Sequence, residues 1–215
     1  MITVSAIRSP KRRVLAKESR ANWFRYYAGF SEGFVEDTIA ELDLRDGATL
    51  LDPWLGAGTT SQVATAKGYR IRGFDLNPAM LLVAKARTLA TCESKRIRAL
   101  TDAICRHYER SLKSDEKSSR PASDPLEQWL QPATARAFRR LERSVAATLS
   151  EPEPSLTTPI WSRADRVSAI LAFFYVGLFR ALRHFISEFQ SSNPTWIKTS
   201  DGKGRVYLSA DRILN

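Results

Sequence analysis

The sequence has 215 residues, of which 43% are hydrophobic, and its 33 basic and 23 acidic residues give a formal net charge of +10. This length fits one α/β domain with a helical addition, and the hydrophobic content excludes a chain that is disordered throughout. The positive charge favours a polyanionic partner, with nucleic acid first and an acidic protein or a membrane surface behind it.

The chain begins with a basic arm, residues 1–25, in which Glu18 is the only acid. Its basic residues are Arg8, Lys11, Arg12, Arg13, Lys17, Arg20 and Arg25. Two interpretations stay open for this arm: a solvated tail, or a strip that contacts phosphates. In the second case the nucleic-acid-binding residues are Arg8, Lys11, Arg12 and Arg13.

Residues 26–92 alternate between helical and strand patterns. The predicted elements are a helix over 31–44 capped by Ser31, a strand over 48–52, a helix over 59–67, a strand over 69–75 and a helix that starts at Pro78. Short connections between these elements predict a parallel sheet with right-handed crossovers. We therefore expect a Rossmann-like α/β core here.

Residues 93–190 are predicted to form a mainly helical insertion. The pattern is mixed over 93–120 and polar enough for a loop over 111–123, and helices are expected over 133–149 and 164–189. A last short run, 205–208, has strand character and lies in the C-terminal segment 191–215. We find no other strand pattern after residue 76.

The sequence predicts a soluble, cytoplasmic protein that has no membrane segment. The basic arm is not followed by the apolar region of a signal peptide, and the most hydrophobic run, 167–179, is shorter than the ~20 residues that span a bilayer. Cys92 and Cys105 form no C-x-x-C pair, which argues against a disulfide framework or a structural zinc site. We expect no metal.

A strand that ends on an acid and continues through two glycines into a helix is a nucleotide-binding device. Here Asp52 ends the first strand, and Gly56 and Gly58 lead into the next helix. Glycines let the backbone approach a ligand, and a helix N-terminus offers N–H groups to an anion or a carboxylate. Asp75 ends the second strand, where a doubly wound sheet places a carboxylate against a ribose diol.

Two ligand classes compete for this site. A dinucleotide fold has Gly-x-Gly-x-x-Gly, but Ser61 stands at the third glycine position. The stretch Asp-Pro-Trp-Leu-Gly-Ala-Gly-Thr-Thr at 52–60, followed by Phe-Asp-Leu-Asn-Pro at 74–78, instead resembles the amino-methylating DNA methyltransferases, whose loop is Asp-Pro-Phe-x-Gly-x-Gly-Thr-Thr. The aromatic-rich segment 23–30 is also similar to the one before that loop in the family. The resemblance is tight over residues 22–87, and it favours S-adenosyl-L-methionine (SAM) as the cofactor.

The resemblance also implies which residues bind the cofactor. These are Asp52, Pro53, Trp54, Gly56, Gly58, Thr59, Thr60, Asp75, Asn77 and Pro78. The glycine loop, with Asp52 and the two threonines, would hold the methionine end of SAM. Asp75 would accept both ribose hydroxyls, and Trp54, Asn77 and Pro78 would line the adenosine. The alternatives are a core aromatic under the loop for Trp54 and a turn residue for Asp75.

One motif of this family is missing. Its members need a tetrapeptide of the type Asp/Asn/Ser-Pro-Pro-Tyr, in which the polar residue holds the target amino group and the ring stacks on the flipped base. No such tetrapeptide occurs in the sequence. The nearest segment is Ser-Asn-Pro-Thr-Trp at 192–196, which makes Asn193 the candidate catalytic residue. The alternative is a turn at the rim of the site.

The resemblance implies methyl transfer from SAM to an exocyclic amino group of adenine or cytosine in DNA, in restriction–modification or defence. Because the tetrapeptide is missing, we expect this chain to be the SAM-binding portion of the enzyme. A second polypeptide would then supply the catalytic motif within a hetero-oligomer. The alternatives are an RNA methyltransferase with a related loop and a non-catalytic SAM-binding or scaffold subunit.

Overall fold

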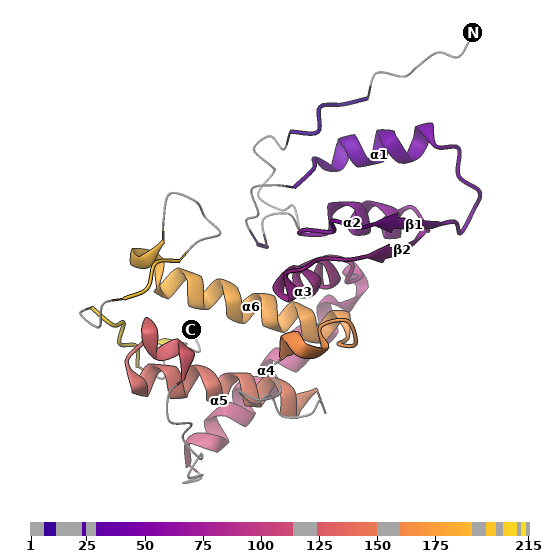
Figure 1. The fold of residues 1–215 in the computed structure, drawn as a ribbon. Coiled ribbons are helices and arrows are strands. Elements are labelled where there is room, and N and C mark those ends of the chain that lie inside the picture. The colour runs from indigo at the N-terminus through magenta and orange to yellow at the C-terminus, as the bar shows by residue number, and fades with distance from the viewer. Residues whose placement is uncertain are drawn as a thin grey trace. The chain divides into compact units, whose positions relative to one another are not determined.

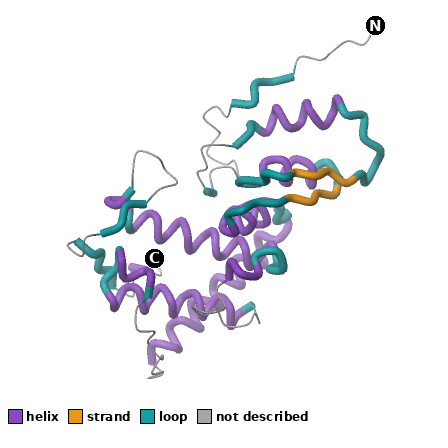
Figure 2. Tube along the Cα trace, viewed as in Figure 1, coloured by secondary structure: helices purple, strands orange, loops and turns teal. Residues whose placement is uncertain are grey.

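The computed structural model describes residues 7–11, 23–24, 29–113, 124–149, 160–190, 197–200, 204–209 and 212–213. This part of the chain is mostly helical, and its two strands form one parallel sheet (Figures 1 and 2). The chain divides into two compact units, Met1–Leu89 with Trp161–Val176, and Ala90–Ile160 with Gly177–Asn215. The sequence placed a boundary near residue 92, and the chain passes from the first unit to the second between Leu89 and Ala90. Residues 161–176 were expected in the helical insertion but group with the first unit.

The first unit contains the predicted order of strand, helix, strand and helix. Its elements are α1 (Glu32–Glu41), β1 (Thr49–Asp52), α2 (Thr59–Ala66), β2 (Arg70–Gly73) and α3 (Pro78–Arg87). β1 and β2 are parallel, with Thr49 opposite Arg70 and Asp52 opposite Gly73. The mixed α/β class is therefore confirmed. The described sheet has two strands, and the larger Rossmann-like sheet stays a prediction.

Side-chain caps define where two of these helices begin. The Ser31 hydroxyl accepts a hydrogen bond from the Phe34 N–H at 3.2 Å, which confirms the predicted cap of α1. At α3 the Asn77 side chain accepts from the Ala79 N–H at 3.0 Å, and Pro78 occupies the first helical position. Asn77 and Pro78 therefore have a structural role as the start of α3.

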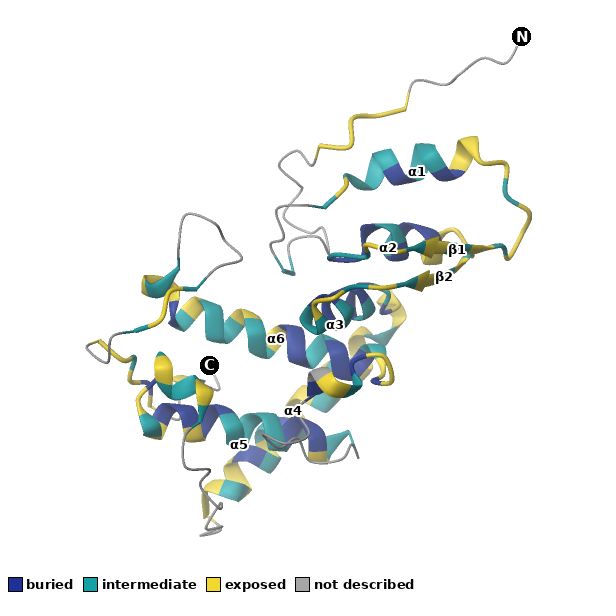
Figure 3. Cartoon of the chain, viewed as in Figure 1, coloured by how far each residue is buried: buried dark blue, intermediate teal, exposed yellow. Residues whose placement is uncertain are grey.

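The two faces of the sheet differ. On one face Leu50 and Ile71 pack against a small core from α1 and α2, formed by Val35, Ile39, Val63 and Ala64. On alternate positions Thr49, Leu51, Arg70 and Arg72 are exposed (Figure 3). We call these four residues the open sheet face. Parallel sheets are usually covered on both faces, so an exposed face is unusual for this architecture.

The second unit is helical. It includes the short 3₁₀ segments η2 (Thr91–Glu93), η3 (Pro125–Gln128) and η5 (Ser187–Phe189), and the helices α4 (Ser94–Lys113) and α5 (Pro132–Thr148). The sequence predicted a mixed pattern after residue 93 and a loop from residue 111. The structure has one continuous helix up to Lys113, so both predictions were wrong over that range. Ile97, Leu100, Ile104 and Tyr108 recur at helical spacing, and the many charged residues between them masked that period.

Helix α6 (Ala169–Phe185) contributes to both units and is shorter than the helix expected over 164–189. The segment η4 (Ile160–Arg163) and a turn precede it. The strand expected over 205–208 is wrong, because within the described part of this segment Val206 makes a single isolated parallel bridge, with Leu130. That bridge leads into the core of the second unit, which contains Leu130, Phe138, Ile186 and Leu208.

No helix among the described residues has both the length and the apolar character needed to cross a bilayer.

Candidate functional site

A hollow of about 690 Å³ lies where the carboxyl ends of β1 and β2 meet the glycine loop. It is lined by Gly29, Phe30, Asp52, Pro53, Trp54, Leu55, Gly56, Ala57, Thr59, Thr60, Phe74, Asp75 and Leu76. This volume is within the usual range of ~300–1,000 Å³ for pockets that bind small molecules. The carboxyl edge of a parallel sheet is also where such folds bind ligands.

Backbone hydrogen bonds hold the two strand ends together. The Phe74 N–H donates to the Asp52 carbonyl at 2.9 Å, and the Leu55 N–H donates to the Phe74 carbonyl at 2.8 Å. The Asp52 carboxylate accepts the Trp54 N–H at 3.1 Å, which fixes the turn after β1. The turn after β1 and the residues that follow β2 are therefore held beside each other.

Asp75 connects the second strand to the glycine loop. Its Oδ2 accepts the Gly56 N–H at 2.7 Å, and its Oδ1 accepts the Asn77 N–H at 2.8 Å. An ionised carboxylate has about four acceptor positions, so it can accept further bonds from a ligand. The interpretation of Asp75 as a turn residue and its interpretation as a ribose ligand are therefore compatible, and it also holds the loop.

The glycines of the loop adopt backbone conformations that other residues rarely adopt. Gly56 has φ +51° and Gly58 has φ +76°, both in the left-handed region. A Cβ at Gly58 would lie 2.4 Å from the Ala84 Cβ on α3, so only glycine lets the loop approach this helix. Gly58 also precedes α2 as its N-cap and contributes no side-chain cap.

The rim of the hollow is apolar and exposed. Trp54 is 85% exposed, so the interpretation as a core aromatic under the loop is wrong. Phe30, Phe74 and Leu76 are also exposed. Apolar side chains beside a hollow suit the flat face of an aromatic ligand, because covering both removes them from water.

The structure places most of the predicted cofactor residues around one hollow. Gly58, Asn77 and Pro78 do not line it, since they support the loop and begin α3. The sequence assigned no role to Gly29, Phe30, Leu55, Ala57, Phe74 and Leu76. These residues lie within the recognised motifs or next to them in the sequence. That proximity could have indicated that they line the same hollow. Asn193 lies outside the described residues.

The basic arm makes contacts that the sequence did not indicate. Arg8 donates from Nε to Asp37 at 2.8 Å and from Nη2 to Asp37 and Glu36 at 2.7 and 2.9 Å. The side-chain bonds to Asp37, and second to them a bond of 2.8 Å from the Arg8 backbone N–H, lower the pKa of Asp37 to about 2. Arg8 is therefore paired with two acids of α1, and its contact with a phosphate stays a prediction. The Lys11 backbone forms an isolated antiparallel β-bridge with Phe30. Arg12 and Arg13 lie outside the described residues.

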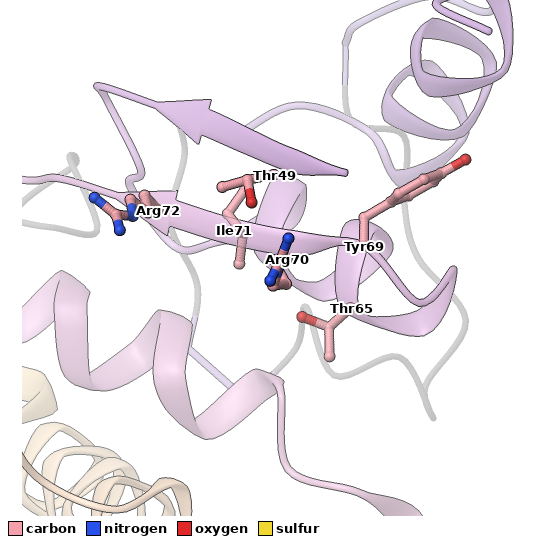
Figure 4. Close-up of a pocket in the computed structure, with 6 residues that line it drawn as sticks. All are labelled: Thr49, Thr65, Tyr69, Arg70, Ile71 and Arg72. Carbon is pink, nitrogen blue, oxygen red and sulfur yellow. The ribbon is translucent and has the colours of Figure 1, made fainter. Parts of the chain in front are cut away.

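A second hollow, of about 560 Å³, lies beside β2. It is lined by Thr49, Thr65, Tyr69, Arg70, Ile71 and Arg72 (Figure 4). The Arg70 and Phe74 N–H groups bond toward β1, to the carbonyls of Ala48 and Asp52. Alternate residues of a strand direct their backbone groups to opposite edges, so Ile71 and Gly73 face the other edge of β2. Within the described residues that edge pairs with no strand.

Comparison with known proteins finds partial similarity to type II methyltransferases. Over 61 residues, 28% of this chain, the sequence is 46% identical to the type II methyltransferase M.BsoBI of Geobacillus stearothermophilus. Over 120 residues, 56% of the chain, it is 28% identical to the type II methyltransferase M.MwoI of Methanothermobacter wolfeii. The matched parts cover 12% and 17% of these two relatives, so the chain corresponds to a small part of each. No family model and no solved structure matches. The resemblance inferred from the motifs is thus confirmed as a partial similarity.

Proposed function

We propose that this chain is the SAM-binding portion of a DNA methyltransferase that modifies an exocyclic amino group of adenine or cytosine. The observation that carries the proposal is the hollow at the ends of β1 and β2, where two strand-end aspartates meet a glycine loop. The partial similarity to type II methyltransferases supports the same ligand class.

The residues around the hollow suit the chemical groups of SAM. The N-terminus of α2 offers N–H donors to the methionine carboxylate, and the Asp52 carboxylate suits the amino group. Asp75 has acceptor capacity for ribose hydroxyls, and Trp54 and Phe74 offer apolar faces to adenine. When bound, SAM supplies an electrophilic methyl group on a sulfonium. The part of this chain is to orient that methyl group at the strand ends.

The transfer also needs an acceptor held in line with the methyl group. An exocyclic amine is a weak nucleophile until a polar group accepts its hydrogens and directs its lone pair. In this sequence Asn193 is the candidate for that role, and the tetrapeptide Asp/Asn/Ser-Pro-Pro-Tyr does not occur. We therefore include a second polypeptide with that motif in the proposal.

The open sheet face, and the edge of β2 that pairs with no strand in the described part of the chain, support such a partner. Leu51 is 66% exposed on that face, and Arg70 and Arg72 beside it make no ion pair within the described residues. Exposed strand edges and large exposed apolar groups are typical of interaction surfaces. A strand of the partner would pair with this edge, and a second element of the partner, with acidic side chains toward the two arginines, would cover the open sheet face.

Ligand titration with the full chain tests the cofactor assignment. We expect SAM and its demethylated product to bind and NAD not to bind. Asp75→Ala should weaken SAM binding by about 1–3 kcal/mol, because ribose hydroxyls lose their acceptor. The exposed Asp102→Ala on α4 is the control and should leave the affinity unchanged. Tight NAD binding without SAM binding would contradict the proposal.

Tritium transfer from labelled SAM to unmethylated DNA tests the need for a partner. We expect no turnover by the purified chain, and turnover after addition of a polypeptide that carries the tetrapeptide. Leu51→Asp should abolish this complementation while SAM binding by the chain persists. Robust turnover by the chain alone, lost in Asn193→Ala, would show that the enzyme needs no second chain.

A further inference from the structure

A buried arginine lies beneath the glycine loop. Arg87, in the last turn of α3, is 1% exposed and is among the largest fully buried side chains. Most of α3 is buried as well (Figure 3). Burying a guanidinium is costly unless its N–H groups are hydrogen-bonded, so its position points to a specific set of acceptors.

Two of those acceptors belong to segments that form the hollow. The Arg87 Nη1 donates to the Ala57 carbonyl at 2.7 Å, and its Nη2 donates to the Phe24 carbonyl at 3.2 Å. Ala57 stands between the two glycines of the loop. Phe24 belongs to the aromatic-rich segment, whose last residues, Gly29 and Phe30, line the hollow. One side chain thus connects the loop with the segment that precedes it.

The bond to Ala57 fixes a single peptide plane. The Ala57 carbonyl and the Gly58 N–H belong to the same planar unit, and the Gly58 N–H donates to the Leu55 carbonyl at 2.9 Å. This plane is therefore held at both ends, by Arg87 on one side and by Leu55 on the other. It also immediately precedes α2, whose N-cap offers no side chain to its first N–H groups.

We propose that Arg87 is a positioning residue that sets the affinity for the amino-acid half of the cofactor. Glycines have wide conformational freedom, so a loop with two of them needs an external anchor to keep one orientation. Arg87 supplies that anchor from the buried side and keeps the first N–H groups of α2 directed into the hollow. The proposal rests on the proposed function, because those N–H groups are assigned to the methionine carboxylate.

Asp75 provides a contrast within the same loop. It holds the Gly56 N–H and lies at the position assigned to the ribose, whereas Arg87 holds the peptide next to α2. Loss of Arg87 should therefore affect the methionine half of the ligand and spare the adenosine half. A general loss of stability would affect both halves alike.

Two ligands distinguish these outcomes: S-adenosylhomocysteine, and 5′-methylthioadenosine, which lacks the amino acid. Titration with the full chain should show that Arg87→Met lowers the affinity for S-adenosylhomocysteine on the order of 10-fold. It should lower the affinity for methylthioadenosine less than about 3-fold. Arg87→Lys should lie between wild type and Arg87→Met, since lysine keeps a donor but not the fork. The control is Leu82→Ala, a buried change on the same helix, which should leave the ratio of the two affinities unchanged.

Equal weakening of both ligands by Arg87→Met, or the same ratio change in Leu82→Ala, would overturn the proposal. Hydrogen exchange of a peptide that covers residues 52–60 tests the anchor without any ligand. We expect this peptide to exchange faster in Arg87→Met than in Leu82→Ala, and equal rates would also overturn the proposal. If wild type binds neither ligand, the proposed function fails, and the exchange rates still decide whether Arg87 orders the loop.

Discussion

The strand-and-loop region, residues 29–89, and the helical second unit use their polar side chains in different ways. In the first, Asp52 and Asp75 accept backbone N–H bonds and also line a hollow, and large apolar side chains remain exposed around it. In the second, Arg139 is held between Asp124 at 2.8 Å and Glu142 at 2.9 Å. Polar groups that line a hollow can bind a ligand, whereas groups that satisfy each other stabilise the fold. The comparison therefore predicts which substitutions change affinity and which change stability.

Gly58→Ala is the strongest test of the first region. The added methyl group would lie 2.4 Å from the Ala84 Cβ, at a φ of +76°. Strain and overpacking together should lower the free energy of unfolding by about 2–5 kcal/mol. Gly47→Ala is the control, because Gly47 has φ +69° but no atom near its added Cβ, so it should cost only about 1–2 kcal/mol. Urea unfolding measures both, and equal losses would show that the loop does not depend on α3.

Asp124→Asn tests the second region. Burial alone raises the pKa of Asp124, but hydrogen bonds from Arg139 and the Leu126 N–H outweigh it and place this pKa below its ordinary value. The carboxylate therefore stabilises the fold above about pH 4, and this contribution is lost as the pH falls through the lowered pKa. We expect the variant to lose about 1–2 kcal/mol at pH 7, and the difference from wild type to shrink below about pH 4.

Asp124→Asn should leave SAM affinity unchanged. Asp75→Ala is the matched change in the first region and should lower that affinity. Unfolding curves at pH 7 and pH 3, combined with ligand titration, measure both effects. A loss of SAM affinity in Asp124→Asn as large as that in Asp75→Ala would remove the distinction between the two regions.

Substitution of Arg8 should have the smallest effect of the three. Arg8 belongs to the first unit, but it forms ion pairs with acidic side chains, as Arg139 does in the second unit. Its hydrogen bonds hold the pKa of Asp37 at about 2. In Arg8→Met the Asp37 carboxyl should titrate near its ordinary value of about 4. Carboxyl chemical shifts measured against pH report this midpoint, with Lys11→Met as the control. An unchanged midpoint in Arg8→Met would mean that Arg8 is available to phosphates.

Much of the candidate site could be predicted because its residues are consecutive. The loop at residues 52–60 and the segment at 74–78 each follow a strand, and parallel strands bring their carboxyl ends to one edge. The spacing of the motifs was therefore enough to expect Asp52 and Asp75 near each other. The cap at Ser31 and the helix start at Pro78 were also accessible, since both depend on residues within one turn.

Other features depended on contacts between distant parts of the chain. The predicted strand at 205–208 failed because a strand needs a partner along its length, and among the described residues Val206 makes a single isolated bridge, with Leu130. The basic arm suggested phosphate contacts, yet Arg8 pairs with acids on α1 that lie 28 and 29 residues away. A charge pattern along the chain cannot say which opposite charge the fold will bring beside it.

The sequence by itself determined the order of strand, helix, strand and helix, the position of the glycine loop and the likeness to methyltransferases, because each depends on residues close together in the chain. Only the tertiary structure decided that Trp54 is exposed, that one face of the sheet is open, and that Arg87 is buried against Ala57. Local conformation follows from neighbours along the chain. Burial and long-range hydrogen bonds depend on which surfaces the folded chain covers. The residues next to Arg87 and Trp54 in the sequence therefore do not predict the burial of the one or the exposure of the other.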